Sequence, residues 1–193
     1  MIYLNNYGWN DKLSQLKQES TYNALTHGRI SIVHRTCYEV VSENGLFQCE
    51  LTGNMMYGKS DIELPCTGDW VLFQPFDEHK GIIVDMLPRE RTLYRKKNGT
   101  VADKQAIASY VDKAFIVQSL DDNFNVRRAE RFMVQMQEEN INPVLVFNKA
   151  DLGFDEQKVE EQIRHIARQI PVFFTSIHQP QTILQLRESI SAG

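Results

Sequence analysis

The pattern of apolar and polar positions changes near the middle of the chain. From about residue 28 to residue 88, apolar and polar positions alternate in short runs, and turn signals separate the runs. Asn44-Gly45 is a strong signal of this kind, because both residues tolerate the positive φ angles of a type I′ hairpin turn. Some four or five short strands within about sixty residues predict a small closed β-barrel, and we expect an OB-fold. The predicted strands contain Arg29–Val33, Tyr38–Val41, Leu46–Leu51, Trp70–Phe73 and Gly81–Val84.

From about residue 107 onward, apolar runs alternate with amphipathic segments. Ala114–Val117, Val144–Phe147 and Val172–Phe174 are short apolar runs typical of buried strands. The segments between them repeat apolar residues at helical spacing, as in Ala129–Met136, and Pro180 can open a last helix. This alternation predicts a parallel α/β sheet, and three strands make that sheet look incomplete.

The predicted fold class is therefore mixed, with an all-β OB-fold barrel followed by an incomplete α/β domain. We expect an N-terminal extension that is partly helical, then the barrel, then a basic linker, and last the α/β part. The predicted boundaries are 1–25, 26–95, 96–106 and 107–193.

Composition and charge exclude several classes of protein. An apolar fraction of 42% and a charged fraction of 24% in 193 residues suit packed cores, and a net charge of −4 gives no bulk reason to expect nucleic acid. Cys37, Cys49 and Cys66 form no C-x-x-C pair, so we expect reduced thiols and no metal site. Neither a membrane-spanning stretch nor a signal peptide is recognisable, so we expect a cytoplasmic protein.

Four residues, Asn148-Lys149-Ala150-Asp151, directly follow the apolar run Pro143–Phe147. An Asp carboxylate can accept hydrogen bonds from both the ring N1–H and the exocyclic amine of guanine, a pair of donors that adenine lacks. The Lys stem can lie over the base, and the Asn amide can meet the base edge or fix the neighbouring loop. Open α/β sheets bind ligands at the carboxyl ends of their strands. We therefore predict that Asn148, Lys149 and Asp151 contact guanine.

A second base-contacting loop is predicted at Ser176-Ile177, which follows the next apolar strand. GTPases place a loop there, usually Ser-Ala, whose backbone N–H meets the guanine oxygen. Ile replaces the usual Ala in this chain, and a role of the backbone can survive that change.

A literal phosphate-loop pattern, G-x-x-x-x-G-K-S, occurs at Gly53–Ser60. A working loop follows a buried parallel strand and opens a helix. Here the preceding strand alternates, and Pro65 falls where the helix interior should be. No Asp in the chain has a Gly three positions later, so the metal-linked D-x-x-G pattern is also missing. We expect Gly53–Ser60 to be a barrel loop, with Lys59 solvated or facing RNA.

One basic cluster lies where the predicted barrel ends. It has two interpretations, a solvated linker or a surface that contacts RNA phosphates, and an OB-fold next to it suits the second. Its members are Arg89, Arg91, Arg95, Lys96, Lys97 and Lys104.

The order of these features resembles the ribosome small-subunit-dependent GTPase A family, the circularly permuted GTPases, in which the base-reading motifs precede the phosphate loop. The resemblance covers about Thr26 to Gly193. The segments that carry it are Gly68–Val71, Leu87–Arg89, Leu93–Lys96, Gln105–Ala108, Val111–Val117, Asn123–Arg128, Glu130–Phe132 and Val144–Leu152.

The resemblance implies an intact protein that binds GTP or GDP with Mg²⁺ and hydrolyses GTP when the small ribosomal subunit stimulates it. Such a protein assists late maturation of that subunit, its barrel docks on ribosomal RNA, and a C-terminal module holds zinc. By the same resemblance, Asn148, Lys149, Asp151, Ser176 and Ile177 contact the base.

Because the phosphate loop, the D-x-x-G segment and the zinc module are missing, we expect an N-terminal fragment that is a monomer, binds no cofactor tightly and is inactive alone. Two alternatives remain open. The chain could be a non-catalytic module that binds RNA or the ribosome, or a standard GTPase that uses Gly53–Ser60.

Overall fold

The computed structural model describes residues 1–96, 104–122, 124–153, 155–168 and 170–190. Within these ranges the chain forms two compact units, of which the first spans Met1–Val111 and the second begins at Asp112. Each unit is described by itself. In the described residues, no helix has both the length and the apolar character to cross a membrane.

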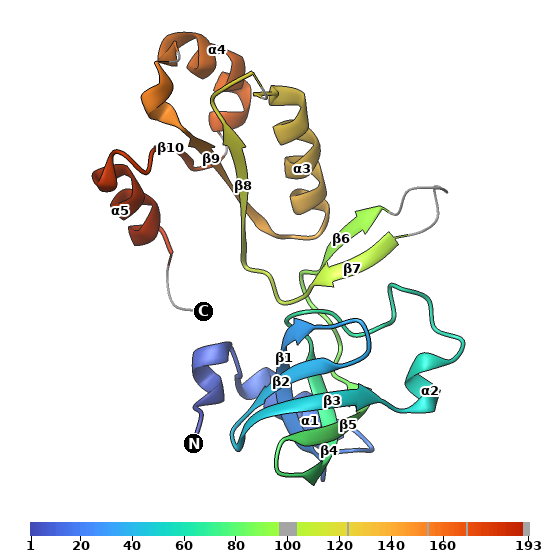
Figure 1. Cartoon of the computed structure of the whole chain (residues 1–193). Helices are drawn as coiled ribbons and strands as arrows, with labels where there is room; N and C mark the ends of the chain where they lie inside the picture. Colours follow the sequence, from blue (N-terminus) through green and yellow to red (C-terminus); the bar gives the residue numbers. More distant parts are fainter. Residues whose placement is uncertain (97–103, 123, 154, 169, 191–193) are drawn as a thin grey trace. The chain divides into compact units, whose positions relative to one another are not determined.

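The first unit is built around a β-barrel, as predicted (Figure 1). Among residues 1–96, five strands close in the order β1-β2-β3-β5-β4, with β3 and β5 parallel and the other neighbouring pairs antiparallel. Glu43 and Asn44 join β2 to β3, so the hairpin turn lies one residue before the Asn44-Gly45 pair of the sequence signal. Gly45, the first residue of β3, has a φ of 124°, which a glycine adopts without strain. The strands are β1 (Thr26–Val33), β2 (Tyr38–Ser42), β3 (Gly45–Leu51), β4 (Trp70–Asp77) and β5 (Lys80–Met86).

Alternating side chains of these strands fill the barrel. In β3, Phe47 and Cys49 are buried while their neighbours Leu46, Gln48 and Glu50 are exposed, which is the period of two that the sequence shows. A short helix, α2 (Gly53–Met56), follows β3 and buries Met55 in the same core. The buried members of this core are Ile30, Val40, Phe47, Cys49, Met55, Val71, Phe73 and Ile83.

The N-terminal segment belongs to the first unit. It contains η1 (Leu4–Tyr7) and α1 (Asp11–Glu19), and the Asn10 side chain caps α1 by accepting from the Leu13 N–H at 3.1 Å. Leu4 and Leu13 pack with Trp70 in a second core. The predicted extension 1–25 is therefore packed against the barrel, because Leu4 and Leu13 are buried in one cluster with residues of the barrel strands.

Two further strands, β6 (Leu93–Lys96) and β7 (Lys104–Ala108), form an antiparallel pair. The two strands lie at the two ends of the predicted linker 96–106 and extend beyond it on both sides. The residues after β7 stay with the first unit, since the Ser109 N–H donates to the Thr67 carbonyl at 2.9 Å and the Tyr110 N–H donates to the Glu90 carbonyl at 2.7 Å. The boundary between the units thus lies at Val111–Asp112 and not at 106–107.

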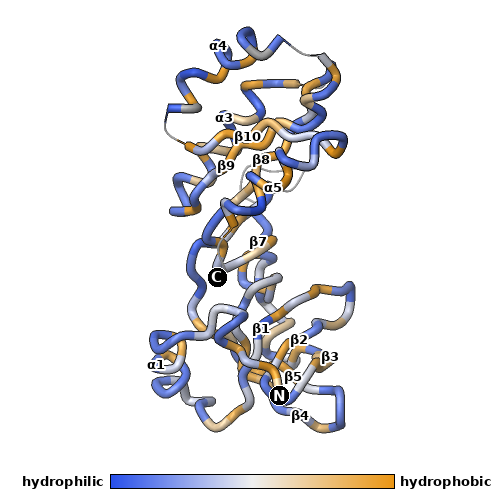
Figure 2. Tube along the Cα trace, turned by 90° about the vertical axis from the view of Figure 1, so that its left-hand side faces the viewer, coloured by the Kyte–Doolittle hydropathy of each residue, from blue (hydrophilic) through white to orange (hydrophobic). Residues whose placement is uncertain are grey.

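The second unit is an α/β layer. In its described residues, three parallel strands lie in the order β10-β9-β8, and Figure 2 colours much of β9 and β10 as hydrophobic. Helices α3 and α4 bury Met133 and Ile163 against the sheet. Phe132, which the helical spacing places on the inner face of α3, is 47% exposed. The elements are β8 (Lys113–Ser119), α3 (Val126–Glu138), β9 (Asn142–Asn148), η2 (Ala150–Leu152), α4 (Glu156–Ala167), β10 (Val172–Thr175) and α5 (Pro180–Glu188).

Candidate functional site

The carboxyl ends of the strands in the second unit lie side by side. Asn148 at the end of β9 is in register with Ser119 of β8 and with Thr175 of β10. The Leu120 N–H also donates to the Asn148 carbonyl at 2.8 Å. The residues after each strand therefore emerge at one edge of the sheet, where open α/β sheets bind ligands.

The turn after β9 has an unusual backbone. Lys149 has a φ of 65°, in the left-handed region that residues other than Gly and Asn seldom adopt. The short helix η2 follows Lys149 immediately. The Leu152 N–H closes the turn by donating to the Lys149 carbonyl at 3.2 Å. Such a conformation persists where the surrounding structure holds it, and it is common at ligand sites.

Asp151 and Ser176, predicted from separate motifs, are in direct contact. The Ser176 hydroxyl donates to Oδ1 of Asp151 at 2.5 Å, and Oγ of Ser176 accepts from the His178 N–H at 3.0 Å. Ser176 is fully buried, whereas Asp151 is exposed. The Ser176 hydrogen bond, with a smaller contribution from the charge of His178, holds the pKa of Asp151 below its usual value of 3.8. Asp151 is thus a fixed, ionised acceptor.

Asn148 joins neighbouring strands. Its Oδ1 accepts a hydrogen bond from the Thr175 hydroxyl at 3.2 Å, so the amide fixes the start of the loop after β10. The Ser176 N–H donates to the Thr182 hydroxyl at 3.1 Å. Ile177 is 77% exposed, and its N–H makes no hydrogen bond among the described residues, whereas the N–H groups of Ser176 and His178 are bonded. The Ile177 N–H is therefore the candidate donor of this loop for a ligand oxygen.

Asp121 is a member of this edge that the sequence did not predict. Lys149 Nζ lies 2.8 Å from Oδ2 of Asp121, and Oδ1 of Asp121 accepts from the Ser119 hydroxyl at 2.8 Å. The signal that could have found Asp121 is its position two residues after β8, at the same sheet edge as Asn148. The sequence does not give the register of β8 and β9, and only this register shows that their ends lie side by side. Sequence reasoning therefore missed Asp121.

The segment Gly53–Ser60 does not have the geometry of a phosphate loop. Helix α2 covers only Gly53–Met56 and ends before Lys59, and the N–H and hydroxyl of Ser60 both donate to Glu63, at 2.9 Å and 2.7 Å. In residues 57–69, all of which the structure describes, no helix follows. Backbone N–H groups at a helix start, which would hold phosphates, are therefore not placed next to Lys59.

Arg89 lies inside the first unit. Its guanidinium makes a bidentate pair with Asp69, in which Nη2 lies 2.6 Å from Oδ2 and Nε lies 2.9 Å from Oδ1. It also donates to the carbonyls of Ile62 and Leu64. The Asp69 side chain is fully buried and that of Arg89 is 14% exposed. The sequence groups Arg89 with cations for RNA, but its donors are already engaged, so it is no part of the RNA surface proposed below.

The other basic residues lie at or near the β6–β7 pair. Arg95 and Lys104 are exposed, and Lys104 Nζ lies 5.7 Å from the centroid of the Tyr94 ring. Arg91 faces Glu90, with Nη1 3.3 Å from Oε2. Lys96 ends β6, Lys59 is exposed after α2, and Lys97 lies outside the described residues.

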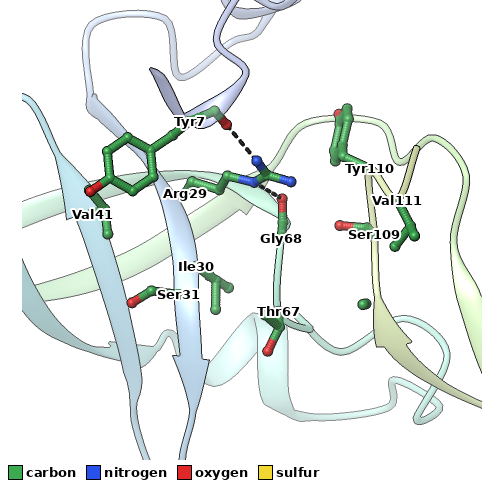
Figure 3. Close-up of a pocket in the computed structure, with 11 residues that line it drawn as sticks. Tyr7, Arg29, Ile30, Ser31, Val41, Thr67, Gly68, Ser109, Tyr110 and Val111 are labelled. Atoms are coloured by element: carbon green, nitrogen blue, oxygen red, sulfur yellow. Dashed lines mark hydrogen bonds between the residues drawn. The ribbon is translucent and has the colours of Figure 1, made fainter. Parts of the chain in front are cut away.

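The first unit also contains a cavity of about 330 Å³ (Figure 3). Arg29 lies on its wall, where Nε donates to the Gly68 carbonyl at 3.1 Å and Nη1 donates to the Tyr7 carbonyl. Two backbone carbonyls thus accept hydrogen bonds from the Arg29 guanidinium. Much of the remaining wall is apolar, including Ile30, Val41 and Val111. Within the described residues, no three His, Cys, Asp or Glu side chains lie close enough to hold a metal ion.

Solved structures share this fold. The crystal structure of YjeQ from Thermotoga maritima superposes with a TM-score of 0.64 at 24% identity, covering 86% of this chain and 57% of that one. A structure titled YloQ, a circularly permuted GTPase, superposes with a TM-score of 0.58 at 21% identity, covering 90% and 59%. A barrel followed by a parallel sheet with N-K-x-D at its carboxyl edge thus defines the chain as one with the fold of the circularly permuted GTPases.

Sequence comparison gives the family. The profile of the RsgA GTPase family matches residues 86–193, and the chain belongs to this family. It is 72% identical over 187 residues to the small ribosomal subunit biogenesis GTPase RsgA 1 of Bacteroides thetaiotaomicron. That alignment covers 97% of this chain and 53% of the relative, so the chain spans about half the length of the curated relatives it matches.

Proposed function

We propose that the whole protein binds and hydrolyses GTP in the maturation of the small ribosomal subunit, and that this chain supplies its guanine-reading site and an RNA-binding surface. The observation that carries the proposal is the Asp151 carboxylate, fixed by the buried Ser176 and held ionised at the carboxyl edge of the sheet. Family membership and the name of the Bacteroides relative support the same reaction.

Each residue of the edge has a distinct task in the proposed site. The two carboxylate oxygens of Asp151 accept from N1–H and from the exocyclic amine, which selects guanine over adenine. The Ile177 N–H donates to the guanine oxygen, and the aliphatic stem of Lys149 covers one face of the base. Asn148 and Ser176 fix the two loops, which keeps these groups in place before the nucleotide arrives.

The chemical step needs groups that the described residues do not offer. Magnesium and a phosphate loop supply the charge stabilisation on which phosphoryl transfer depends. The residues of this chain bind and orient the base, and we assign none of them a catalytic role. The isolated chain is therefore expected to bind GTP weakly and not to hydrolyse it.

The proposed RNA surface lies on the first unit. Arg95 and Lys104 are exposed on the β6–β7 pair, and Lys59 is exposed after α2. A local basic surface of this kind can bind phosphates although the net charge of the chain is −4. We propose that Lys59, Arg91, Arg95, Lys96, Lys97 and Lys104 contact ribosomal RNA together with the barrel, in a monomeric protein of the cytoplasm.

The test is GTP hydrolysis by the full-length protein with and without purified small ribosomal subunits. We expect slow hydrolysis by the protein alone and a clear stimulation when the subunits are added. Binding to the subunits without any hydrolysis would instead identify a non-catalytic module. Hydrolysis that subunits do not stimulate would remove the ribosomal part of the proposal.

A further inference from the structure

Lys149 meets a carboxylate that belongs to a different strand end. Lys149 Nζ and Asp121 Oδ2 lie 2.8 Å apart, with the Lys149 side chain 51% exposed and that of Asp121 23% exposed. An ion pair as exposed as this one contributes little to folding. Its effect is instead on where the lysine points, because a free lysine side chain populates many rotamers.

The structure fixes Asp121 before it meets the lysine. Its Oδ1 accepts from the Ser119 hydroxyl at 2.8 Å, and its carbonyl accepts from the Phe124 N–H at 2.9 Å. The preceding residue, Leu120, is buried in the core and donates its N–H to the Asn148 carbonyl at 2.8 Å. Side chain and backbone of Asp121 are thus tied both to β8 and to the end of β9.

Lys149 is fixed from its own side by its backbone. Its φ of 65° turns the chain into η2, which contains Asp151. The backbone conformation of Lys149 therefore sets both where Asp151 lies and where the Lys149 side chain begins. The turn holds the Cα of Lys149 and Asp121 holds its ammonium, so the aliphatic stem between them is restricted at both ends. A stem restricted in this way offers an apolar surface on which the flat face of a base can stack.

We propose that Asp121 is a positioning residue for guanine nucleotide, which orders the Lys149 side chain before the base binds. The inference rests on the proposed function of the Asn148–Asp151 loop. Asp121 acts on the face of the base through Lys149, whereas Asp151 reads the edge, so the two carboxylates have separable effects. Ordering a long side chain in advance removes that entropic cost from binding.

The test compares GDP affinity of the full-length protein and of Asp121→Asn, Lys149→Met and the double variant, by competition with a fluorescent GDP. Lys149→Met keeps an aliphatic stem and removes the ammonium. We expect Asp121→Asn to weaken GDP binding by about threefold to tenfold, and to have no further effect in the Lys149→Met background. Asp122→Asn, an exposed neighbour with the same change of charge, is the matched control and should bind like the unmodified protein.

Selectivity provides a readout that a merely structural role would not give. Because Asp151 is untouched, the ratio of GDP to xanthosine diphosphate affinity should stay the same in Asp121→Asn within about twofold. A changed ratio, or an equal loss in both backgrounds, would show a distorted loop and overturn the inference. Ser119→Ala removes a hydrogen bond to Asp121 without touching its charge, and it should give a smaller loss of the same kind.

The outcomes separate this inference from the proposed function. If the unmodified protein binds GDP and Asp121→Asn binds it equally well, only the role of Asp121 is refuted. If the unmodified protein does not bind GDP at all, both the proposed site and the positioning role are refuted. Thermal unfolding of Asp121→Asn checks that the variant is folded, and Ser119→Ala with Lys149→Met tests the inference if it is not.

Discussion

Ser176 links two motifs that are distant in sequence and gives Asp151 its chemical state. The serine is buried, so its hydroxyl cannot turn to water, and its hydrogen bond to Oδ1 leaves the other lone pairs of the carboxylate for a ligand. Since this hydrogen bond holds the pKa of Asp151 below 3.8, the carboxylate is ionised from about pH 5 to pH 8. Asp151 therefore contributes no pH dependence to guanine binding in that range.

Replacing Ser176 by Ala should weaken GDP binding by the full-length protein about threefold to tenfold, because one hydrogen bond to a charged group is lost. The measurement is GDP affinity by calorimetry at about pH 7. Ser189→Ala removes a hydroxyl that bonds to the Leu186 carbonyl in the same unit, and it should leave the affinity unchanged. An unchanged affinity in Ser176→Ala would show that Asp151 does not depend on this contact.

At this scale the sequence predicts site residues from their type and from their place after apolar strands. The structure brings Asn148, Lys149, Asp151 and Ser176 to one edge, and their contact with guanine stays a prediction. Asp121 could not be predicted, since its place at this edge depends on strand register. Arg89 was grouped with surface cations because a sequence gives no sign that a buried carboxylate, here Asp69, faces it.

The connection between α2 and β4 is held by the buried pair of Asp69 and Arg89. Besides pairing with Arg89, Asp69 Oδ2 accepts from the Cys66 N–H at 2.7 Å, and the guanidinium reaches the carbonyls of Ile62 and Leu64. A long segment without strands is thus fixed to the start of β4. Removing one partner would leave a buried charge without compensation, which is far more costly than losing a surface pair.

Arg89→Ala should lower the free energy of unfolding by about 3–5 kcal/mol. Arg89→Lys should not restore it, because one ammonium cannot replace a bidentate guanidinium that also reaches two carbonyls. The measurement is chemical denaturation, with exposed Arg95→Ala as the control, expected within about 0.5 kcal/mol of the unmodified protein. A loss below about 1 kcal/mol for Arg89→Ala would contradict the account.

The first unit also contains two buried thiols that resist ionisation, Cys49 in β3 and Cys66 before β4. Burial raises the pKa of the Cys49 thiol from 9.0 to about 12, and burial does the same for Cys66. In the unfolded chain these thiols lose their protons near their ordinary pKa, so the native state binds protons more tightly above about pH 9. Their contribution to stability is therefore complete below about pH 9 and is lost as the pH rises towards 12.

The free energy of unfolding should fall as the pH rises from about 8 to 11. Cys49→Ala should reduce the slope of this fall by up to about 1.4 kcal/mol per pH unit. Comparing pH slopes cancels the cavity that the substitution leaves. Cys66→Ala removes the other buried thiol and should make the fall shallower in the same way. Equal slopes for all three proteins would show that both thiols ionise freely in the folded state.

At the level of elements, the barrel strands and the α/β order could be predicted because period-two alternation and helical spacing are local patterns. The β6–β7 pair could not, because its segment is short and rich in charge, which is also the composition of a linker. The backbone pairing between β6 and β7 and the burial of Ala106 make this segment a regular hairpin, and amino-acid composition does not reveal either feature.

The whole molecule is proposed to join a guanine site in one unit to an RNA surface in the other. Binding that depends on phosphate contacts weakens steeply with salt, because each contact releases a counterion. The number of phosphate contacts that the β6–β7 pair makes can therefore be estimated from the slope of log affinity against log salt.

Lys104→Ala and Arg95→Ala should each reduce the slope of log affinity against log salt by about 0.7–0.9 for binding to small ribosomal subunits. Filter binding across a salt series measures the slope. Lys158→Ala, an exposed lysine of α4 in the other unit, is the control and should leave the slope unchanged. Slopes that stay constant in both hairpin variants would remove β6–β7 from the RNA surface.

The central claim is that Asp151 reads the edge of guanine, and the most direct test is the base preference of full-length Asp151→Asn. Xanthine carries a carbonyl where guanine carries its amine, and an Asn amide can donate to that carbonyl. GDP, xanthosine diphosphate and ADP affinities should be measured side by side. We predict that the unmodified protein prefers GDP, and that Asp151→Asn loses about tenfold to a hundredfold in GDP affinity while gaining xanthosine diphosphate binding. An Asp151→Asn protein that keeps its affinity and its preference for GDP would contradict the account.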